Sequence, residues 1–436
     1  MNSKDLILQK IKVFEEQIAV IGLGEIGLRL AVAFAAEGLS VTGFETSEKR
    51  IDQVNAGENY VRDLDGSHFS DLVSNGKLRA SNDFSQLSTF DAIFICVPTP
   101  LDKFRKPDMS FIQHACEAIA VNMKRGTFIC LESTTYPTTT EDFVLPILET
   151  QSGLKQGEDF WLAFSPERVD PGNSEYKTRN TPKVIGALTD EGLEIGKALY
   201  QKIIDEVYPV SSPKVAEMVK ILENTYRLVN ISLINELALL CGKMDIDIWE
   251  VIEAAKTKPY GFQAFYPGPG IGGHCIPLDP FYLEYIAKKF GFDLSMINTA
   301  GHINNMMAHR MTIKITSALN SHQKAINGSR IVFLGVAYKA NIDDYRESPA
   351  LKIMEEVQQK GGLISYHDPY IPTVQMQNDD LLKSVELTEN LLQNADCVVI
   401  STNHDTFKST FILNNSRLIV DLRNAIQEPS GKVYKL

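Results

Sequence analysis

One cysteine of this chain lies where no regular secondary structure is expected. The segment PGPGIGGHCIPLDP, residues 267–280, surrounds Cys275 with four glycines and four prolines. Glycine and proline hold such a segment in an irregular shape, and a partly exposed thiol there can act as a nucleophile if a neighbour stabilises its thiolate. Asp279 follows four residues later, one turn away if a helix begins here. The alternative is that Cys275 is a small residue filling a tight turn.

Four further polar residues could contribute to the same chemistry. Lys220 and Asn224 lie four residues apart in a helical pattern, so both project from one helix face. Such a pair can polarise a substrate oxygen and hold a water, although an exposed lysine and a capping-type asparagine are commoner for any single pair. Glu167 follows FSP and Thr135 lies in STTYP, each at the end of a predicted strand. Both therefore point to the carboxyl edge of a sheet, where ligands bind.

The N-terminal region predicts a dinucleotide site. The segment QIAVIGLGEIG runs from an apolar strand into Gly22, Gly24 and Gly27 and then into a helix, and a second strand ends at Glu45. This is GxGxxG in its proper context, with the pyrophosphate at the helix N-terminus and the acid on the adenosine ribose. Glu45 favours NAD over NADP, because a 2′-phosphate would meet like charge. Arg50 could accommodate such a phosphate, or lie against the adenine or pyrophosphate.

Three regions are expected along the chain. Alternating strands and helices predict a parallel, doubly wound α/β sheet in an N-terminal Rossmann domain, residues 1–211. A long helical pattern begins near Ser212 and predicts a central helix, with a helical region of residues 212–323 that forms a subunit interface and carries the Cys275 loop. The strand, glycine turn, helix and acid-ended strand return after Lys324, which predicts a second Rossmann-like domain, residues 324–436, without GxGxxG.

Basic residues of the C-terminal half could hold a nucleotide phosphate. Lys339, Arg346 and Arg423 lie in turns or strand ends of the second Rossmann-like region, and Lys258 precedes the proline- and glycine-rich segment. For each of them an ordinary solvated surface position is the alternative.

The amino-acid composition is typical of an ordinary soluble protein. The 436 residues carry a net charge of −12, which argues against nucleic-acid and membrane-surface partners. No apolar run is long enough for a spanning helix, and the N-terminus has no signal-peptide core, so the cytoplasm is the expected compartment. The six cysteines have no CxxC spacing, and the histidines form no HExxH-type cluster, so no metal site is expected.

Several motifs occur together in order: GLGEIG, VPTP, STTYP, FSPER, KILEN, GPGIGGHCIPLD and GVAYKANIDDYRESP. Through them the chain resembles the UDP-glucose/GDP-mannose (nucleotide-sugar 6-) dehydrogenase family from about residue 17 to 425. The resemblance implies NAD-dependent oxidation of a sugar C6 alcohol to a carboxylate, with two NAD per sugar and no free aldehyde. It also implies that Cys275 attacks the C6 aldehyde and becomes a thioester, which water hydrolyses.

Matching positions imply roles for the remaining residues. Lys220 would stabilise the developing oxyanion, Asn224 would position the substrate, and Asp279 would order or activate the hydrolytic water, with Thr135 and Glu167 assisting the proton transfers. The implied cofactor contacts are Gly22, Gly24, Gly27, Glu45, Arg50, Thr99, Thr135 and Arg346. The implied substrate contacts are Glu167, Lys220, Asn224, Lys258, Tyr266, Gly270, Tyr338, Lys339 and Arg423, and the loop 266–272 would close over the sugar.

The sequence departs from the UDP-glucose branch of this family. Leu278 stands where a lysine usually precedes the aspartate matching Asp279, Glu45 stands where aspartate is usual, and ERVDPGN replaces EFLxEG. HCIPLDPFYL resembles the branch that oxidises UDP-N-acetylhexosamines for bacterial O-antigens and capsules, and KTKPYGFQAFYPGPG resembles its UDP-N-acetylglucosamine enzymes. UDP-N-acetylmannosamine and UDP-glucose remain alternative substrates.

Two other functions fit parts of the pattern. A two-electron 3-hydroxyacid dehydrogenase also has a GxGxxG domain, a long helical segment and a Lys/Asn pair, but needs neither the second Rossmann-like region nor Cys275. A non-catalytic NAD- or UDP-sugar-binding regulator needs none of Cys275, Lys220 and Asp279.

Overall fold

The computed structural model describes residues 3–61, 64, 66–102, 106–170, 173, 175–273, 276–377 and 379–436, without the side chains of 66 and 67. The chain forms two compact units. The first contains Met1–Glu223 and Phe281–Gly291, and the second contains Asn224–Pro280 and Phe292–Leu436. The predicted division into three regions stays a prediction, and each unit is described by itself.

The first unit is built on a sheet that has eight strands over the described residues, in the order β3-β2-β1-β4-β5-β6-β7-β8. Its pairs are parallel except β6 with β7, which is antiparallel. The doubly wound α/β prediction is therefore confirmed, with one reversed strand pair that hydrophobic patterns could not indicate. The strands are β1 (Gln17–Ile21), β2 (Ser40–Phe44), β3 (Leu78–Ser81), β4 (Ala92–Ile95), β5 (Thr127–Leu131), β6 (Phe160–Phe164), β7 (Lys183–Ala187) and β8 (Val207–Val210).

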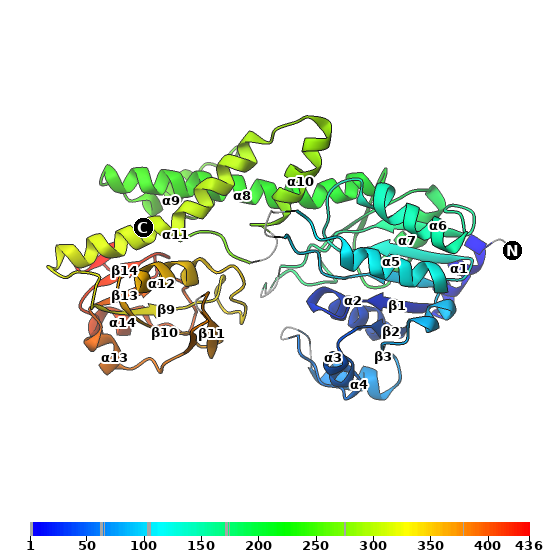
Figure 1. Cartoon of the computed structure of the whole chain (residues 1–436), viewed down its shortest axis with the longest axis horizontal. Coiled ribbons are helices and arrows are strands. Elements are labelled where there is room, and N and C mark those ends of the chain that lie inside the picture. The colour runs from blue at the N-terminus through cyan, green and yellow to red at the C-terminus, as the bar shows by residue number, and fades with distance from the viewer. Residues whose placement is uncertain are drawn as a thin grey trace. The chain divides into compact units, whose positions relative to one another are not determined.

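Helices cover both faces of this sheet, because its strands are apolar on both sides. In β1, Ile18 and Val20 pack into one core, whereas Ala19 and Ile21 pack into another. The first core includes α1 (Ser3–Val13), α2 (Glu25–Ala36), α4 (Gly66–Ser74) and α7 (Asp190–Tyr200). The second includes α5 (Ser110–Asn122) and α6 (Leu145–Ser152) (Figure 1). The short α3 (Glu48–Asn55) follows β2.

The predicted long helix is α8 (Pro213–Lys243), 31 residues that run from the first unit into the second (Figure 1). In the first unit its Ile221 is buried with Tyr136, Tyr282 and Ile286. Tyr282 and Ile286 belong to α10 (Asp279–Ala287). In the second unit α8 is followed by α9 (Ile248–Lys256), and a second long helix, α11 (Ser295–Ser321), was not predicted.

The second unit contains a parallel sheet with the order β10-β9-β13-β14-β15 over the described residues, as predicted for a second Rossmann-like region. Its strands are β9 (Arg330–Leu334), β10 (Leu363–His367), β13 (Cys397–Ile400), β14 (Ile419–Asp421) and β15 (Val433–Lys435). α11 and α12 (Pro349–Gln359) pack on one face, and α13 (Glu389–Asn394) and α14 (Ser409–Asn415) on the other. β11 (Thr373–Gln375) and β12 (Leu381–Lys383) form a separate antiparallel pair.

The predicted repeat extends to the first turn of each sheet. Gly22 and Gly335 both have positive φ, 88° and 81°, and a Cβ on either would overlap the backbone just after the neighbouring strand. An acid after the second strand accepts backbone N–H bonds from that turn in both sheets. Glu45 accepts from Leu23, and Asp368 accepts from Val336 and Ala337.

Candidate active site

The β1–α2 turn has the space that a dinucleotide needs. A Cβ on Gly27 would overlap the carbonyl oxygen of Gly22, so this glycine allows helix and strand to pack closely. A Cβ on Gly24, by contrast, would meet no atom within 4 Å. The open side at Gly24 lies at the N-terminus of α2, where backbone N–H groups favour an anion. These three glycines fit the pyrophosphate of NAD.

The Glu45 carboxylate makes more contacts within the protein than the sequence indicated. Its carboxylate accepts hydrogen bonds from the backbone N–H groups of Leu23 at 3.1 Å, Thr46 at 2.9 Å and Ser47 at 3.1 Å, and it pairs with Arg50 at 3.3 Å. Burial alone would raise the pKa of Glu45, but the backbone donors and Arg50 outweigh burial and lower it. Glu45 therefore carries negative charge beside the glycine turn, and its contact with the adenosine ribose stays a prediction.

Thr99 and Thr135 lie on loops at the carboxyl edge of the first sheet, and both are buried. The hydroxyl of Thr99 donates to the Thr134 carbonyl at 2.7 Å, and the hydroxyls of Thr135 and Thr139 lie 2.7 Å apart. Thr138 and Thr140, on the segment that follows Thr135, donate hydrogen bonds to the carboxylate of Glu217 on α8.

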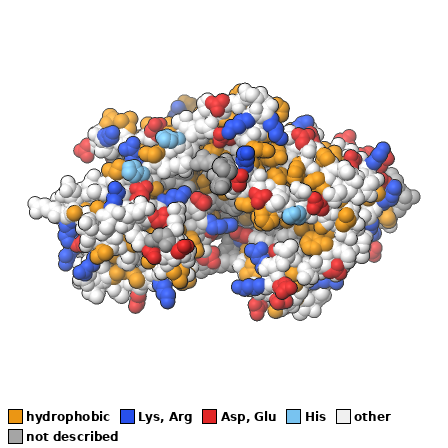
Figure 2. Space-filling model, viewed as in Figure 1, with side chains coloured by type: hydrophobic (Ala, Val, Ile, Leu, Met, Phe, Trp, Pro, Cys, Tyr) orange, Lys and Arg blue, Asp and Glu red, His pale blue; other side chains and the backbone are white. Residues whose placement is uncertain are grey.

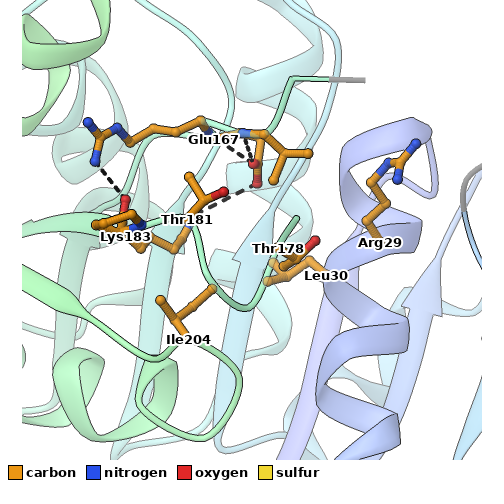
Figure 3. A pocket seen from close by; sticks show the side chains of 10 residues that line it. Arg29, Leu30, Glu167, Thr178, Thr181, Lys183 and Ile204 are labelled. Carbon is orange, nitrogen blue, oxygen red and sulfur yellow. Dashed lines mark hydrogen bonds and ion pairs between the residues drawn. The ribbon is translucent and has the colours of Figure 1, made fainter. Parts of the chain in front are cut away.

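Glu167 and Lys220 are brought together after β6. The Lys220 ammonium donates to the backbone carbonyl of Glu167 at 2.6 Å. The Glu167 carboxylate accepts from the backbone N–H groups of Arg168 at 2.9 Å and Val169 at 2.7 Å, and it lines a shallow pocket (Figure 3). α8 is also joined to this loop by the ion pair of Arg168 with Glu223 at 2.7 Å. The loop therefore presents the Glu167 carboxylate, while Lys220, the lysine predicted to act on the substrate, holds the backbone of Glu167.

In the second unit the structure brings Asn224 and Asp279 together. The amide of Asn224 donates to the Asp279 carboxylate at 2.5 Å, and both side chains are buried. α10 begins at Asp279 itself, so the helix starts after the cysteine rather than before it. Cys275 lies outside the described residues.

The segment before Cys275 packs tightly within the second unit. Its backbone N–H groups at Gly268, Ile271 and Gly273 donate to Asn235 at 2.9 Å, Asn304 at 2.6 Å and the Arg346 carbonyl at 3.0 Å, respectively. At three of its glycines a side chain would force a neighbouring group to shift. A Cβ would approach Arg423 to 2.5 Å at Gly268, and Tyr338 to 2.7 Å at Gly272 and 2.9 Å at Gly273.

Arg423 is a half-buried cation after β14. Its Nε donates to the Ser401 carbonyl at 2.9 Å, and burial lowers its pKa to about 10. Within the part of the chain that the structure describes, no carboxylate forms an ion pair with it. A guanidinium in such surroundings favours an anionic ligand.

The other predicted substrate and cofactor residues are spread around the second unit. Tyr266 is stacked on Trp249 and donates to Glu253 at 2.7 Å. Gly270 has φ +128° and lies near Pro349, which restricts it to glycine. Lys258 lies over the ring of Tyr260, Arg346 pairs with Asp344 at 2.6 Å, and Lys339 is half-buried beside Tyr338. The structure tests none of their roles.

Two groups near the site were missed from the sequence: Lys183 with Glu132, and Glu217. Glu132 directly follows β5, so an acid at a strand's carboxyl end was a usable signal. Lys183 begins β7, and no signal in the sequence indicated it, because its contact with Glu132 is made across the sheet.

Among the described residues, none of the helices is long and apolar enough to cross a membrane. On the face drawn in Figure 2, acidic and basic side chains are interspersed.

Three domain models of one family match successive parts of this chain. They are the NAD binding, central and UDP binding domains of the UDP-glucose/GDP-mannose dehydrogenase family, at residues 16–204, 214–306 and 332–428. The chain is 35% identical to a UDP-N-acetyl-D-mannosamine dehydrogenase of Pyrococcus horikoshii over 419 residues, which cover 95% of this chain and 96% of the relative. It is 32% identical to a UDP-N-acetyl-D-glucosamine 6-dehydrogenase of Pseudomonas aeruginosa over 394 residues, 90% and 92% of the two chains.

A solved structure agrees with these sequence comparisons. The UDP-D-ManNAc dehydrogenase structure from Pyrococcus horikoshii superposes with a TM-score of 0.87 at 32% identity, covering 96% of this chain and 98% of that one. The matches extend over both units, and they include the glycine turn of the first sheet and the loop that packs on Arg423. The chain belongs to the UDP-glucose/GDP-mannose dehydrogenase family and is an NAD-binding nucleotide-sugar dehydrogenase.

Proposed function

We propose that this enzyme oxidises the C6 hydroxyl of a UDP-N-acetylhexosamine to the carboxylate in two NAD-dependent steps. The substrate that we propose is UDP-N-acetylglucosamine. The observation that carries the nucleotide part is Arg423, a half-buried guanidinium against the glycine-rich loop with no carboxylate paired to it in the described residues. A diphosphate would supply the missing anion. Tyr338 and Lys339, in the turn after β9, would bind the uridine or the diphosphate beside it.

The loop 266–273 supports the sugar assignment. Because the loop packs closely on Tyr338 and Arg423, its backbone would lie beside the proposed diphosphate, and the attached sugar would extend along the loop. Gly270 and Tyr266 would contact that sugar, and Lys258 would lie at the edge of the site. The choice of N-acetylglucosamine rests on the similarity of residues 256–270 to enzymes of that substrate, together with the 32% identical relative that bears its name.

Different residues would bind the cofactor, stabilise charge on the substrate and position the hydrolytic water. Bound NAD supplies the hydride acceptor and would be held by Gly22, Gly24, Gly27 and the residues that follow them. Lys220 would stabilise negative charge on the C6 oxygen, and Asn224, hydrogen-bonded to Asp279, would orient both the substrate and that carboxylate. Asp279 would order the hydrolytic water.

The carboxyl-edge loops of the first unit would complete the proton transfers. Glu167 would accept or return a proton through its partly exposed carboxylate, and Thr135 would assist through its hydroxyl. Glu45 and Arg50 would bind the adenosine side of NAD, while Thr99 and Arg346 would contact other parts of it.

Cys275 would hold the sugar between the two oxidations. Its thiolate would add to the C6 aldehyde, and the resulting thiohemiacetal would be oxidised to a thioester that water cleaves. A Cys275→Ser variant should stall at the aldehyde level and release little acid. Acid formation by this variant at the native rate would remove the covalent mechanism.

UDP-N-acetylmannosamine is the second candidate, because the 35% identical relative and the superposed structure carry that name. Purified enzyme with NAD should be given UDP-N-acetylglucosamine, UDP-N-acetylmannosamine, UDP-N-acetylgalactosamine and UDP-glucose separately, and NADH absorbance followed. The proposal expects the highest kcat/KM with UDP-N-acetylglucosamine. A higher value with the mannosamine sugar would replace it by the second candidate.

Self-association and a polysaccharide pathway complete the proposal. Several apolar side chains of α8 are exposed, among them Leu222, Leu233, Leu237 and Leu240, and a second copy of the chain would cover them. Light scattering at micromolar concentration should give a dimer or larger assembly, and a monomer would contradict this. A role in surface-polysaccharide synthesis would follow from the resemblance of HCIPLDPFYL to the branch that serves bacterial O-antigens and capsules.

A further inference from the structure

A buried group of charges lies directly behind Glu167 in the first unit. The ammonium of Lys183, whose side chain is 6% exposed, lies 2.8 Å from the Glu132 carboxylate and 3.8 Å from the Glu167 carboxylate. It also donates to the Pro166 carbonyl at 3.3 Å. One buried cation therefore contacts two carboxylates that follow different strands, β5 and β6. Figure 3 shows Lys183 and Glu167 of this group.

The two carboxylates differ in access. Glu132 is fully buried, and the hydroxyl of Tyr200 donates to its other oxygen, while the Cys130 thiol lies 3.3 Å from that hydroxyl. Glu132 is thus closed off from any ligand. The side chain of Glu167 is 17% exposed and lines the pocket, so of this pair it is the carboxylate that can meet a substrate.

Lys183 is placed to control the charge of that carboxylate. Burial alone would raise the pKa of Glu167, but Lys183, the two backbone donors and Lys220 outweigh burial and lower it. Burial also raises the pKa of Glu132, which Lys183 only partly offsets. The pKa of Lys183 itself is raised, because its two carboxylates outweigh the effect of burial, so the ammonium stays charged.

Other ionisable groups reach Glu167 less directly. Cys96, after β4, interacts with it through charge, and Arg29 of α2 and Arg168 line the same pocket. The guanidinium of Arg168 is engaged by Glu223 and the Pro182 carbonyl. Lys220 makes its hydrogen bond to the backbone carbonyl of Glu167 rather than to the carboxylate. Lys183 is the cation for which the structure gives an ion pair with that carboxylate.

We propose that Lys183 is a positioning residue that keeps the Glu167 carboxylate ionised and fixed in the pocket, with Glu132 and Tyr200 holding the Lys183 ammonium in place. This inference rests on the proposed proton-transfer role of Glu167. The Lys183 side chain is less exposed than that of Glu167, and its proposed effect is exerted through Glu167. Lys220 contacts the backbone carbonyl of Glu167 and Lys183 contacts its carboxylate, so the two lysines together restrict the position of Glu167.

The test measures the pKa of Glu167 directly, without turnover. Protein labelled with 13C at the glutamate carboxyl carbon is titrated by NMR, and the Glu167 signal is identified by its loss in Glu167→Gln. Lys183→Met alone would leave the buried Glu132 carboxylate without a cation and destabilise the fold, so Lys183→Met is combined with Glu132→Gln. Glu132→Gln alone is the matched control, and Lys183→Arg retains the charge.

The double variant should raise the pKa of Glu167 by about 1–3 units relative to Glu132→Gln, as expected when an opposite charge at this distance is removed. Lys183→Arg should leave it close to the native value. Equal pKa values in the double variant and Glu132→Gln would overturn the proposal.

The pH dependence of kcat/KM then separates this inference from the proposed function. If Glu167 acts as the base, the acidic limb of the profile moves with the NMR pKa, and Glu167→Gln loses most activity. If the NMR pKa moves while the limb stays and Glu167→Gln remains active, the proton-transfer role of Glu167 fails, whereas the control of its charge by Lys183 is still supported.

Discussion

Glu217 should make the stability of the first unit depend on pH. It lies on α8, fully buried, and accepts hydrogen bonds from Thr138 N–H at 2.6 Å, Thr140 N–H at 2.9 Å and the Thr140 hydroxyl at 2.7 Å. Burial raises its pKa from 4.5 to about 7, and these donors only partly oppose that effect. Since one pKa unit is about 1.36 kcal/mol, the difference is worth ~3 kcal/mol.

The sign follows from proton binding. Between pH 4.5 and 7 the unfolded chain has lost the Glu217 proton while the folded protein retains it. The free energy of unfolding must therefore fall as pH rises through this window, by ~3 kcal/mol in total, and change no further above it. Glu217→Gln removes the titration. Its amide would face backbone donors and lower stability, but equally at every pH.

Tryptophan fluorescence can report this unit alone. Trp161 is buried in β6, and the chain's other tryptophan, Trp249, belongs to α9 in the second unit. In a Trp249→Phe background, urea unfolding at pH 5, 6, 7 and 8 should show a decline with pH that Glu217→Gln lacks. Glu141→Gln, a partly exposed neighbour on the same segment, should keep the decline. Parallel pH profiles with and without Glu217 would refute the reasoning.

Three further outcomes are expected. Glu16→Gln should stabilise the protein at pH 7 by about 1–3 kcal/mol in urea unfolding, because this fully buried carboxylate accepts no hydrogen bond from any other described residue and burial raises its pKa; unchanged or lower stability would contradict it. Gly24→Ala should fold normally yet weaken NAD binding by calorimetry, whereas Gly27→Ala should lose thermal stability because its Cβ overlaps backbone; equal behaviour would contradict the glycine assignment. Arg423→Met should weaken UDP binding roughly 10- to 100-fold, as for loss of a charged hydrogen bond, and leave NAD binding unchanged; native UDP affinity would rule out a diphosphate at Arg423.

Local features were predicted well because each is defined by neighbouring residues. The β1–α2 turn could be predicted because a strand, three glycines at fixed spacing and a helix follow one another. α8 was predicted, with its start within a residue or two, because its apolar positions keep a helical period for 31 residues. The second sheet was predicted because the strand, glycine and acid pattern returned at Gly335 and Asp368.

Features that depend on distant pairing could not be predicted. The antiparallel pairing of β6 with β7 leaves no trace in either strand's own pattern, since both are apolar throughout. Lys183 and Glu132 meet only because that pairing brings their strand ends together. The acid at the end of the second strand of the C-terminal sheet, Asp368, makes five hydrogen bonds, including one with His404, and its own sequence neighbours did not indicate them.

The central claim is that one active site carries the sugar through two oxidations. The measurement that tests it most directly is the amount of NADH formed per UDP-N-acetylglucosamine consumed, counted at completion with excess NAD. The covalent mechanism through Cys275 predicts two NADH per sugar and a uronic acid as the product. One NADH per sugar, with aldehyde accumulating, would contradict it.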